Sequence, residues 1–328
     1  MKAAWYSRNG EAQDVMQLGD LPTPSPQAGE VLVRLAASGV NPSDVKSRRA
    51  RPVNDPLIVP HSDGAGVIEA VGEGVPAARL RERVWLWNAQ WQRPWGSCAE
   101  YIALPSAQAV SLPEGIDFAA GACLGIPGLT AVQAVILAER LGGDLSGQTV
   151  LVSGASSAVG HCITQMVTQV GGRVIGTVGS QAKAEHARAA GMQEAVFYKT
   201  ESVPERVKAL TQGRGADVMI DMDFSTAAAW ASEGALAPHG QVVCYGSNAL
   251  EVALPFRPWL FQSFGVKFFL VYDLPPSDRL QAVARLSQML AAQRLQLSIG
   301  ARFALDQVVQ AHQAVEAGQT VGNVVIAL

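Results

Sequence analysis

The sequence predicts an α/β protein in which a β-rich domain is interrupted by a doubly wound domain with a parallel sheet. The chain of 328 residues is 48% hydrophobic, which is enough for two domains with a core each. Before Gly147, short runs in which Val, Leu and Ile alternate are separated by Gly and Pro, as in β-rich proteins. After Gly147, single helical patterns separate apolar runs, which predicts a parallel sheet with helices on both faces.

The β-rich domain is expected to take strands from four segments, "GEVLVRLAASGVN", "DGAGVIEAVGEGV", "RERVWLW" and "CAEYIALP". The C-terminal part of the chain completes this domain. It has a long amphipathic helix after Pro275 and Pro276, "DRLQAVARLSQMLAAQ", then a short helix and a closing strand, "GNVVIAL". We expect the β-rich domain at residues 1–122 and 273–328 and the parallel-sheet domain at residues 123–272.

Six strands are expected in the parallel-sheet domain, in "TVLVSG", "RVIGTVG", "EAVFY", "DVMIDM", "GQVVCYG" and "VKFFLVY". Helices are expected to begin near Val159, Gln181, Val203 and Ser225. Ligands of such open sheets gather at the carboxyl ends of the strands.

The charge balance gives no electrostatic reason to expect nucleic acid or an anionic membrane as the main partner. The formal net charge is −3, from 25 basic and 28 acidic residues. One basic cluster could attract phosphate, although such clusters are more often solvated loops. Its members are Lys46, Arg48, Arg49 and Arg51.

The cysteines and the N-terminus predict a cytoplasmic protein. The first ten residues lack the apolar run of a signal peptide. Residues 118–138 carry no charge over nearly membrane-spanning length, but Gly and Ala, together with Pro127 and Gln133, which break the apolar run, favour a buried helix between two domains. The four cysteines show no paired spacing, so neither disulfides nor a zinc cluster are expected; they are Cys98, Cys123, Cys162 and Cys244.

The segment "VSGASSAVGHCITQMV" is predicted to bind the diphosphate of a dinucleotide. The strand at 149–153 leads into Gly154, and Gly160 opens the next helix, whose free N–H groups favour an anion. The loop lies between the first strand and the first helix of the alternating strands and helices. In this position its glycine spacing indicates a dinucleotide site. A tight turn that binds nothing is the alternative. Small side chains allow close approach to the backbone, at Ala155, Ser156, Ser157 and Ala158.

The end of the next strand predicts which dinucleotide binds. NAD sites usually carry an acidic residue about 20 residues beyond the glycines. This chain has "VIGTVGSQAK" there, without Asp or Glu, and offers Gly179, Ser180 and Lys183. A cation with hydroxyl groups suits a 2′-phosphate, since each charge-assisted hydrogen bond contributes about 1.5–3 kcal/mol. We therefore expect NADPH, with a solvated Lys183 as the alternative.

Motifs along essentially the whole chain resemble the medium-chain dehydrogenase/reductase superfamily, specifically its zinc-free quinone oxidoreductase branch, the relatives of ζ-crystallin. These motifs are "SGVNPSD", "PHSDGAGVIEAVGEGV", "AEY", "GIPGLTA", "GASSAVG" and "SQAKAEHARAAGMQEAVFYK". The resemblance implies that the β-rich domain is a GroES-like catalytic domain and that the parallel-sheet domain is a Rossmann domain.

The resemblance also implies roles for individual residues. Lys183 and Tyr198 would clamp the 2′-phosphate, and Asn41 and Thr130 would lie beside the nicotinamide and its ribose. Two further residues complete the expected catalytic set with Asn41. Asp44 orients Asn41 or nearby backbone, or caps a turn, and Lys46 donates to a developing oxyanion or faces solvent. The expected cofactor contacts are Asn41, Thr130, Gly154, Ala155, Ser156, Ala158, Val159, Gly160, Gly179, Ser180, Lys183, Tyr198, Tyr245, Gly246 and Ser247.

No metal is expected. Zinc-dependent relatives place a Cys near Asn41, a His near Ser62 and a Cys near Ile126 or Pro127. An amide, a hydroxyl and an apolar residue do not make a tetrahedral nitrogen and sulfur site.

The chain departs from the family's pattern at several points. Ser157 and Ala158 replace two glycines of the usual "GASGGVG" loop, and "DMDFSTAA" lacks a glycine-containing turn. Lys46 stands where a tyrosine is common, which puts quinone contacts of the family's kind in doubt. His61 stands where relatives often have Gly; a lone histidine is more often satisfied in the core or at a rim than catalytic.

Three functions are compatible with the sequence. Without a zinc Lewis acid, the expected chemistry is hydride transfer to an electron-poor π-system. The first function is an NADPH-dependent quinone oxidoreductase, and the second is an enone or enal double-bond reductase on the same scaffold. The third is a cofactor-binding structural or RNA-binding protein like some ζ-crystallin relatives, for which the near-neutral charge offers no support.

Two segments point to surfaces. "GVKFFLVY" is apolar on both faces, and as the last strand of an open sheet it would need cover. We expect a homodimer through residues 266–272, as in the relatives that the chain resembles. "WLWNAQWQRPW" holds four tryptophans that either stack a planar aromatic substrate or belong to a core or interface.

Overall fold

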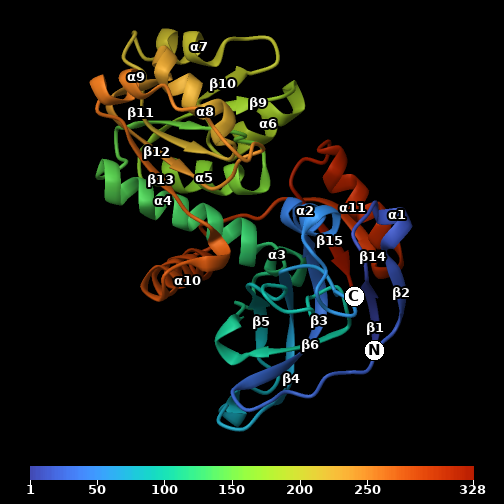
Figure 1. Cartoon of the computed structure of the whole chain (residues 1–328). Helices are drawn as coiled ribbons and strands as arrows, with labels where there is room; N and C mark the ends of the chain where they lie inside the picture. The colour runs from blue at the N-terminus through green and yellow to red at the C-terminus, as the bar shows by residue number, and fades with distance from the viewer. The chain divides into compact units, whose positions relative to one another are not determined.

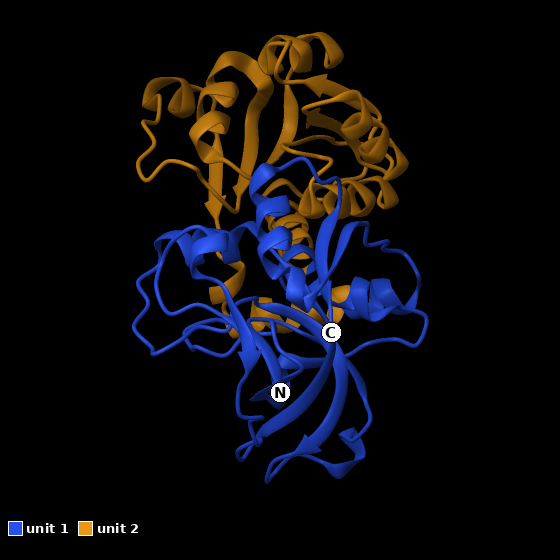
Figure 2. Cartoon of the chain, turned by 90° about the vertical axis from the view of Figure 1, so that its right-hand side faces the viewer, with its two compact units in different colours: residues 1–128, 287–328 blue, residues 129–286 orange.

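The computed structural model describes all residues, 1–328 (Figure 1). The chain forms two compact units (Figure 2). The β-rich unit contains Met1–Gly128 and Ser287–Leu328, and the parallel-sheet unit contains Leu129–Leu286. The predicted α/β fold class is confirmed.

A seven-stranded sheet is the centre of the β-rich unit, in the order β14-β15-β3-β4-β5-β7, with β6 paired to β3. The C-terminal β15 pairs antiparallel with β3, matching Val324 with Val40, so the end of the chain completes this sheet. Strands β1 and β2 form a separate antiparallel pair. The strands are β1 Lys2–Trp5, β2 Gln17–Asp20, β3 Glu30–Val40, β4 Asp63–Val71, β5 Arg83–Leu86, β6 Tyr101–Pro105, β7 Ala109–Ser111, β14 Ile299–Ala304 and β15 Asn323–Ala327.

Short helices cover the ends of this sheet. α2 begins after Asn41 with Pro42 at its first position, and Asn41 and Asp44 form a capping box. α11 lies beside α2 (Figure 1). The α-helices of this unit are α1 Ala12–Val15, α2 Pro42–Ala50, α3 Phe118–Gly121 and α11 Val308–Ala317.

The parallel-sheet unit has six strands in the order β10-β9-β8-β11-β12-β13, all parallel. The chain order reverses between β8 and β11, and this switch point is where open α/β sheets bind ligands. The strands are β8 Thr149–Val152, β9 Arg173–Val178, β10 Glu194–Phe197, β11 Ala216–Asp221, β12 Leu236–Cys244 and β13 Gly265–Phe268.

Four helices of this unit begin where a side chain caps them. Ser157, Ser180, Ser202 and Asp223 accept hydrogen bonds from backbone N–H groups of the first turn. Each of these helices begins within one residue of its predicted start. The helices of the unit are α4 Leu129–Gly142, α5 Ala158–Gln169, α6 Gln181–Ala189, α7 Val203–Leu210, α8 Phe224–Trp230 and α9 Phe256–Phe261; α10 Pro276–Ala291 begins in this unit.

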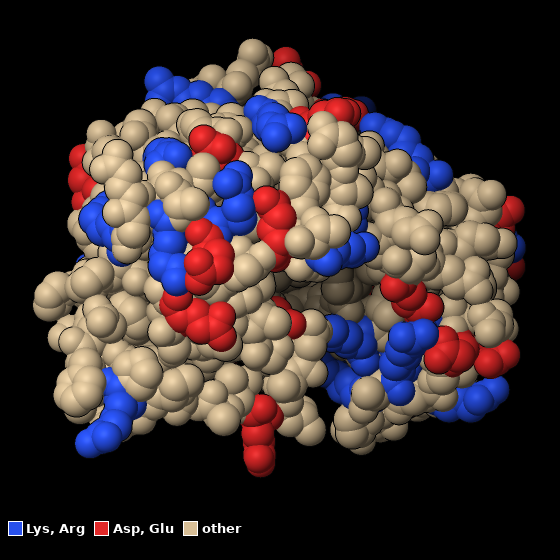
Figure 3. Space-filling view, turned by 90° about the horizontal axis from the view of Figure 1, so that it is seen from above, with Lys and Arg blue, Asp and Glu red and all other residues tan.

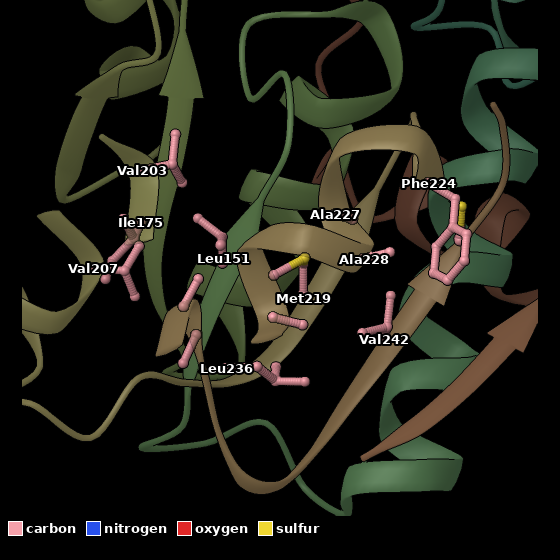
Figure 4. Packing of buried hydrophobic residues seen from close by; sticks show 14 of the residues in the cluster. Leu151, Ile175, Val203, Val207, Met219, Phe224, Ala227, Ala228, Leu236 and Val242 are labelled. Carbon is pink, nitrogen blue, oxygen red and sulfur yellow. The ribbon is translucent and has the colours of Figure 1, made fainter. Parts of the chain in front are cut away.

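Side chains from both strands and helices fill the core on one face of the parallel sheet (Figure 4). Leu151, Met219 and Val242 come from three neighbouring strands, and Val203 and Val207 from α7 pack against them. Strand β8 is buried at every residue. This explains the continuous apolar runs in the sequence, because helices cover both faces of a parallel sheet.

One predicted element differs from the structure. The last strand is predicted to include residues 266–272, but β13 ends at Phe268, the partner of Cys244 at the end of β12. Val271–Asp273 forms a 3₁₀ turn instead, because β12 offers no further pairing residue. In the predicted buried helix, Gln133 lies inside α4, and Pro127 lies in a π-helical turn before it.

The apolar segment around α4 resembles a membrane span in length and composition. Residues Leu124–Gly142 are one helical stretch of this kind, and 83% of its most apolar window is buried inside the structure. A core helix meets the same criteria of length and composition.

Candidate active site

The predicted dinucleotide loop lies at the carboxyl end of β8, at the switch point of the sheet. Gly154 adopts the left-handed conformation (φ +66°), and its N–H donates to Thr177 Oγ1 at 2.9 Å. The N–H of Ala155 donates to the Thr177 carbonyl at 3.1 Å. A Cβ at Gly160 would collide with the carbonyl oxygen of Gly154, so this position requires glycine.

The serine that replaces a family glycine has a structural role. Ser157 is the N-cap of α5, and its Oγ accepts the N–H of Gly160 at 3.0 Å. The helix therefore starts at Ala158, and the N–H groups of Ala158 and Val159 remain at its positive end. Ser156 is buried beside them. The predicted loop residues thus lie together in a geometry that suits an anion.

The residues expected to bind a 2′-phosphate also lie together, at the carboxyl ends of β9 and β10. A Cβ on Gly179 would lie 3.0 Å from the Tyr198 hydroxyl, so this phenol packs against a bare backbone. Ser180 caps α6 by accepting the N–H of Lys183 at 3.4 Å. Tyr198 is 48% exposed, and Lys183 is half-buried. A cation, a phenol and a hydroxyl are thus grouped without a carboxylate at the strand end.

The end of β11 and the turn after it contribute residues that the sequence did not single out. Asp221 is fully buried, and its Oδ2 accepts the N–H of Asp223 at 3.0 Å. Burial raises the pKa of Asp221 to about 6. Burial also opposes ionisation of Asp223, but hydrogen bonds from Ser225 and Asn248 lower its pKa below the usual value.

The predicted residues at the end of β12 lie in this region. The Tyr245 N–H donates to the Asp221 carbonyl at 3.1 Å, and the Gly246 carbonyl accepts the N–H of Phe224 at 3.1 Å. Ser247 Oγ donates to the Ala249 carbonyl at 3.0 Å. These contacts fix the turn after β12 at the carboxyl edge of the sheet.

Met222 belongs to the segment that lacks the family's glycine-containing turn, and its side chain lies over the dinucleotide loop. Its sulfur lies 2.5 Å from the position that a Cβ on Gly154 would occupy. The side chain is 42% exposed. The only sequence signal for this contact is the departure in "DMDFSTAA", which carries a methionine where a glycine-containing turn is expected.

In the β-rich unit, a carboxyl group fixes the side chain of Asn41. Asn41 Nδ2 donates to Asp63 Oδ2 at 2.8 Å, and both residues are buried. Asp44 has another role, because its Oδ2 accepts the backbone N–H of Asn41 at 2.7 Å and thereby caps α2. Of the roles expected for Asp44, these contacts match the capping of a turn and the orientation of nearby backbone. Asp63 belongs to a motif used for the resemblance, but no role was predicted for it.

Burial changes the acidity of both carboxyl groups. It raises the pKa of Asp44 to about 7, against hydrogen bonds from Asn41 and Ser62 that lower it. Burial raises the pKa of Asp63 well above its usual range, and the nearby charge of Asp44 adds to this effect. These two buried carboxyl groups, one bound to the backbone N–H of Asn41 and the other to its side-chain amide, ionise with difficulty near neutral pH.

The basic cluster lies on α2 and at its C-cap, Arg51, and one of its members is buried. Arg48 is fully buried and pairs with Glu316 of α11. Arg49 lies 3.3 Å from the same carboxylate and 2.7 Å from Glu11. The Arg51 guanidinium lies 4.9 Å from the ring centre of Trp91. These arginines connect α1, α2 and α11.

Lys46 is exposed on α2, and Thr130 is buried in the first turn of α4. Among the four tryptophans, Trp85 is fully buried, whereas Trp95 is 38% exposed. Trp91 offers its ring to Arg51. The group therefore divides between a core residue and residues nearer the surface.

The residues at the zinc positions do not fit a zinc ion. Asn41 is hydrogen-bonded to Asp63, Ser62 Oγ donates to the Gln90 carbonyl at 3.1 Å, and Ile126 is apolar and buried. No group of three or more His, Cys, Asp or Glu side chains is arranged to hold a metal ion.

Comparisons with known proteins agree with this geometry. The family model described as "Alcohol dehydrogenase GroES-like domain" matches residues 27–114, and the one described as "Zinc-binding dehydrogenase" matches residues 158–288. A quinone oxidoreductase of Pseudomonas aeruginosa is 31% identical over 322 residues, 95% of each chain. A 2-haloacrylate reductase of Burkholderia sp is 29% identical over 314 residues, 92% of each chain. A mycobacterial protein solved in complex with NADPH is 27% identical, with a TM-score of 0.88 and complete coverage of both chains.

The fold and the dinucleotide loop define an oxidoreductase with a nicotinamide cofactor. The chain belongs to the medium-chain dehydrogenase/reductase superfamily, and within it to the quinone oxidoreductase branch. This confirms the family that the sequence motifs predicted.

Proposed function

We propose that the protein is an NADPH-dependent quinone oxidoreductase that works without zinc. The observation that carries the proposal is the grouping of Gly179, Ser180, Lys183 and Tyr198 at the end of β9 and β10, where an NAD site would carry an acid. The mycobacterial relative solved with NADPH and the Pseudomonas quinone oxidoreductase support the same cofactor and substrate class.

Reduction of a quinone to a hydroquinone takes one hydride, which bound NADPH supplies, and one proton. The chain's own residues bind the cofactor, orient its nicotinamide and polarise the substrate. The α5 N-terminus holds the diphosphate, and Asn41, fixed by Asp63, orients the nicotinamide together with Thr130. Asp44 keeps Asn41 in place through its backbone, and Lys46 donates to the oxyanion that develops on the substrate.

An enone or enal reductase is the second candidate. The Burkholderia 2-haloacrylate reductase favours it, because a 2-haloacrylate contains an α,β-unsaturated carboxylate. The same transfer of hydride and proton saturates such a double bond.

A substrate panel separates these functions. NADPH consumption is measured with quinones of several sizes, with enones and enals, and with 2-haloacrylate. We expect kcat/KM to be at least tenfold higher for the best quinone than for the best unsaturated carbonyl compound. A higher value for an unsaturated carbonyl compound would support the second candidate, and activity with none would favour a cofactor-binding structural or RNA-binding protein. Acidic and basic side chains are interspersed on the face shown in Figure 3, which gives no support to an RNA surface.

We also propose a homodimer that pairs the edge of β13 across a two-fold axis. Val266 and Phe268 of this edge are 38% and 53% exposed, and Phe261 of α9 is 75% exposed. An apolar sheet edge of this kind is normally covered.

If the dimer forms through β13, a single charge on the edge of this strand should disrupt it. Val266→Asp is expected to convert the dimer into a monomer at micromolar concentration, because an ion would have to be buried between two strands. Sedimentation equilibrium measures the mass. Leu80→Asp, at an exposed leucine of the other unit (44% exposed), should leave the dimer intact. A monomeric native protein would contradict the proposal.

A cytoplasmic location remains our proposal for the compartment. None of the cysteines forms a disulfide, and all are buried, namely Cys98, Cys123, Cys162 and Cys244. Proteins of oxidising compartments more often pair their cysteines. Fractionation of cells that express the protein tests this.

A further inference from the structure

Four buried polar side chains form a continuous hydrogen-bonded chain in the β-rich unit, and the proposed mechanism does not use it. Ser38 Oγ lies 2.8 Å from Ser97 Oγ and 2.9 Å from His61 Nδ1. His61 Nε2 lies 3.0 Å from His312 Nε2 of α11. Ser97 Oγ donates to the backbone carbonyl of Asp63. All four of these residues are fully buried.

The chemistry of these atoms permits one order of protons. A carbonyl oxygen only accepts, so Ser97 uses its single proton for Asp63. Ser38 must then donate to Ser97, and Ser38 must accept from His61, which therefore carries its proton on Nδ1. Since Nε2 of neutral His61 then carries no proton, it accepts a hydrogen bond from His312 Nε2. Every proton in the chain points toward Asp63.

The surroundings support neutral histidines in this order. Burial lowers the pKa of His61 well below its usual range, and it lowers the pKa of His312 to about 3 with a further contribution from the charge of Arg48. The assignment leaves His312 Nδ1 without a proton, and this atom has no hydrogen-bond partner in the structure. A bare nitrogen suits a place where a nearby guanidinium opposes protonation.

The backbone at His61 gives an independent reason to look for a role. His61 is in the left-handed conformation (φ +77°), which glycine adopts at no cost and other residues rarely adopt. A histidine at this position therefore carries a conformational penalty. The ring compensates, because it links Ser38 to His312 in the chain of hydrogen bonds.

The chain of hydrogen bonds ends at the residue that holds Asn41. Ser97 fixes the backbone of Asp63 at the start of β4, and Asp63 Oδ2 accepts from Asn41 Nδ2 at 2.8 Å. We propose that Ser38, His61, Ser97 and His312 are positioning residues whose single proton order fixes Asp63 and, through it, the Asn41 amide. The role of Asn41 beside the nicotinamide rests on the proposed function; the proton order does not.

The proton order is tested directly by the tautomers of the two histidines. ¹⁵N-histidine labelling and long-range ¹H–¹⁵N correlation spectra of the native protein distinguish a protonated Nδ1 from a protonated Nε2. Signals are assigned with His61→Gln and His312→Gln. We expect His61 protonated on Nδ1 and His312 on Nε2. A His61 protonated on Nε2 would overturn the proposal, whatever the enzyme reduces.

The positioning role is tested by a pair of substitutions at His312. A glutamine amide can still donate to His61 Nε2, so His312→Gln should keep kcat within about threefold of the native value. His312→Leu removes the donor and should lower kcat about tenfold, while the Kd of NADPH, to which the phosphate contacts of the parallel-sheet unit contribute most, changes less than about twofold. An unchanged kcat in His312→Leu, or equal losses in both variants, would contradict the role. If no substrate is reduced, the proposed function fails, and the tautomers still decide the proton order.

Discussion

Replacing Lys183 by alanine and Tyr198 by phenylalanine together is expected to weaken NADPH binding about 50-fold while NADH binding changes less than about twofold. The two side chains lie at one strand end, where the phenol packs on Gly179 and Lys183 lies in the first turn of α6. A 50-fold loss is about 2.3 kcal/mol, or roughly two charge-assisted hydrogen bonds reduced by solvent screening. The Kd of each nucleotide is measured by fluorescence titration.

A matched control uses the neighbouring lysine. Lys199 is exposed and follows Tyr198 directly, so Lys199→Ala removes the same charge one residue away. It should leave both Kd values within about twofold, since a solvated charge at that distance is screened. Equal affinity of the native protein for NADH and NADPH, unchanged in the double variant, would remove the basis of the cofactor assignment.

Local patterns were sufficient to predict the parallel-sheet unit. The six apolar runs became its six strands, and an inner strand such as β8 is apolar along its length because helices cover both faces. The helix starts were predictable because serine caps precede them, as Ser157 and Ser180 do. The dinucleotide loop follows from the same local order of strand, small residues and helix.

The polar interior of the β-rich unit could not be predicted in this way. The contact between His61 and His312 joins residues 251 positions apart, and the contact between Arg48 and Glu316 joins residues 268 positions apart. No periodicity encodes such pairs. The sequence therefore left His61 without a role and treated Arg48 as a solvated charge, whereas both are fully buried.

The largest effect on stability is expected from Asp44→Asn, and it should depend on pH. Burial raises the pKa of Asp44 to about 7 in the folded state, from 3.8. Between these two values the folded protein binds more protons than the unfolded chain, so the contribution of protonated Asp44 to stability is lost as the pH rises through this window. The variant lacks this titration, while its amide oxygen can still accept the Asn41 N–H.

Relative to the native protein, Asp44→Asn should therefore gain about 4 kcal/mol in its free energy of unfolding between about pH 4 and pH 7, because a proton bound only in the folded state changes this energy by about 1.36 kcal/mol per pH unit. The control Asp20→Asn should show almost no change between pH 4 and pH 7, because the hydrogen bond from Lys2 lowers the pKa of Asp20 and places its titration below this window. A pH-independent difference for Asp44→Asn would mean that this carboxyl ionises in the folded state as it does in water. Urea unfolding followed by tryptophan fluorescence reports mainly on the β-rich unit, which contains Trp5, Trp85, Trp87, Trp91 and Trp95.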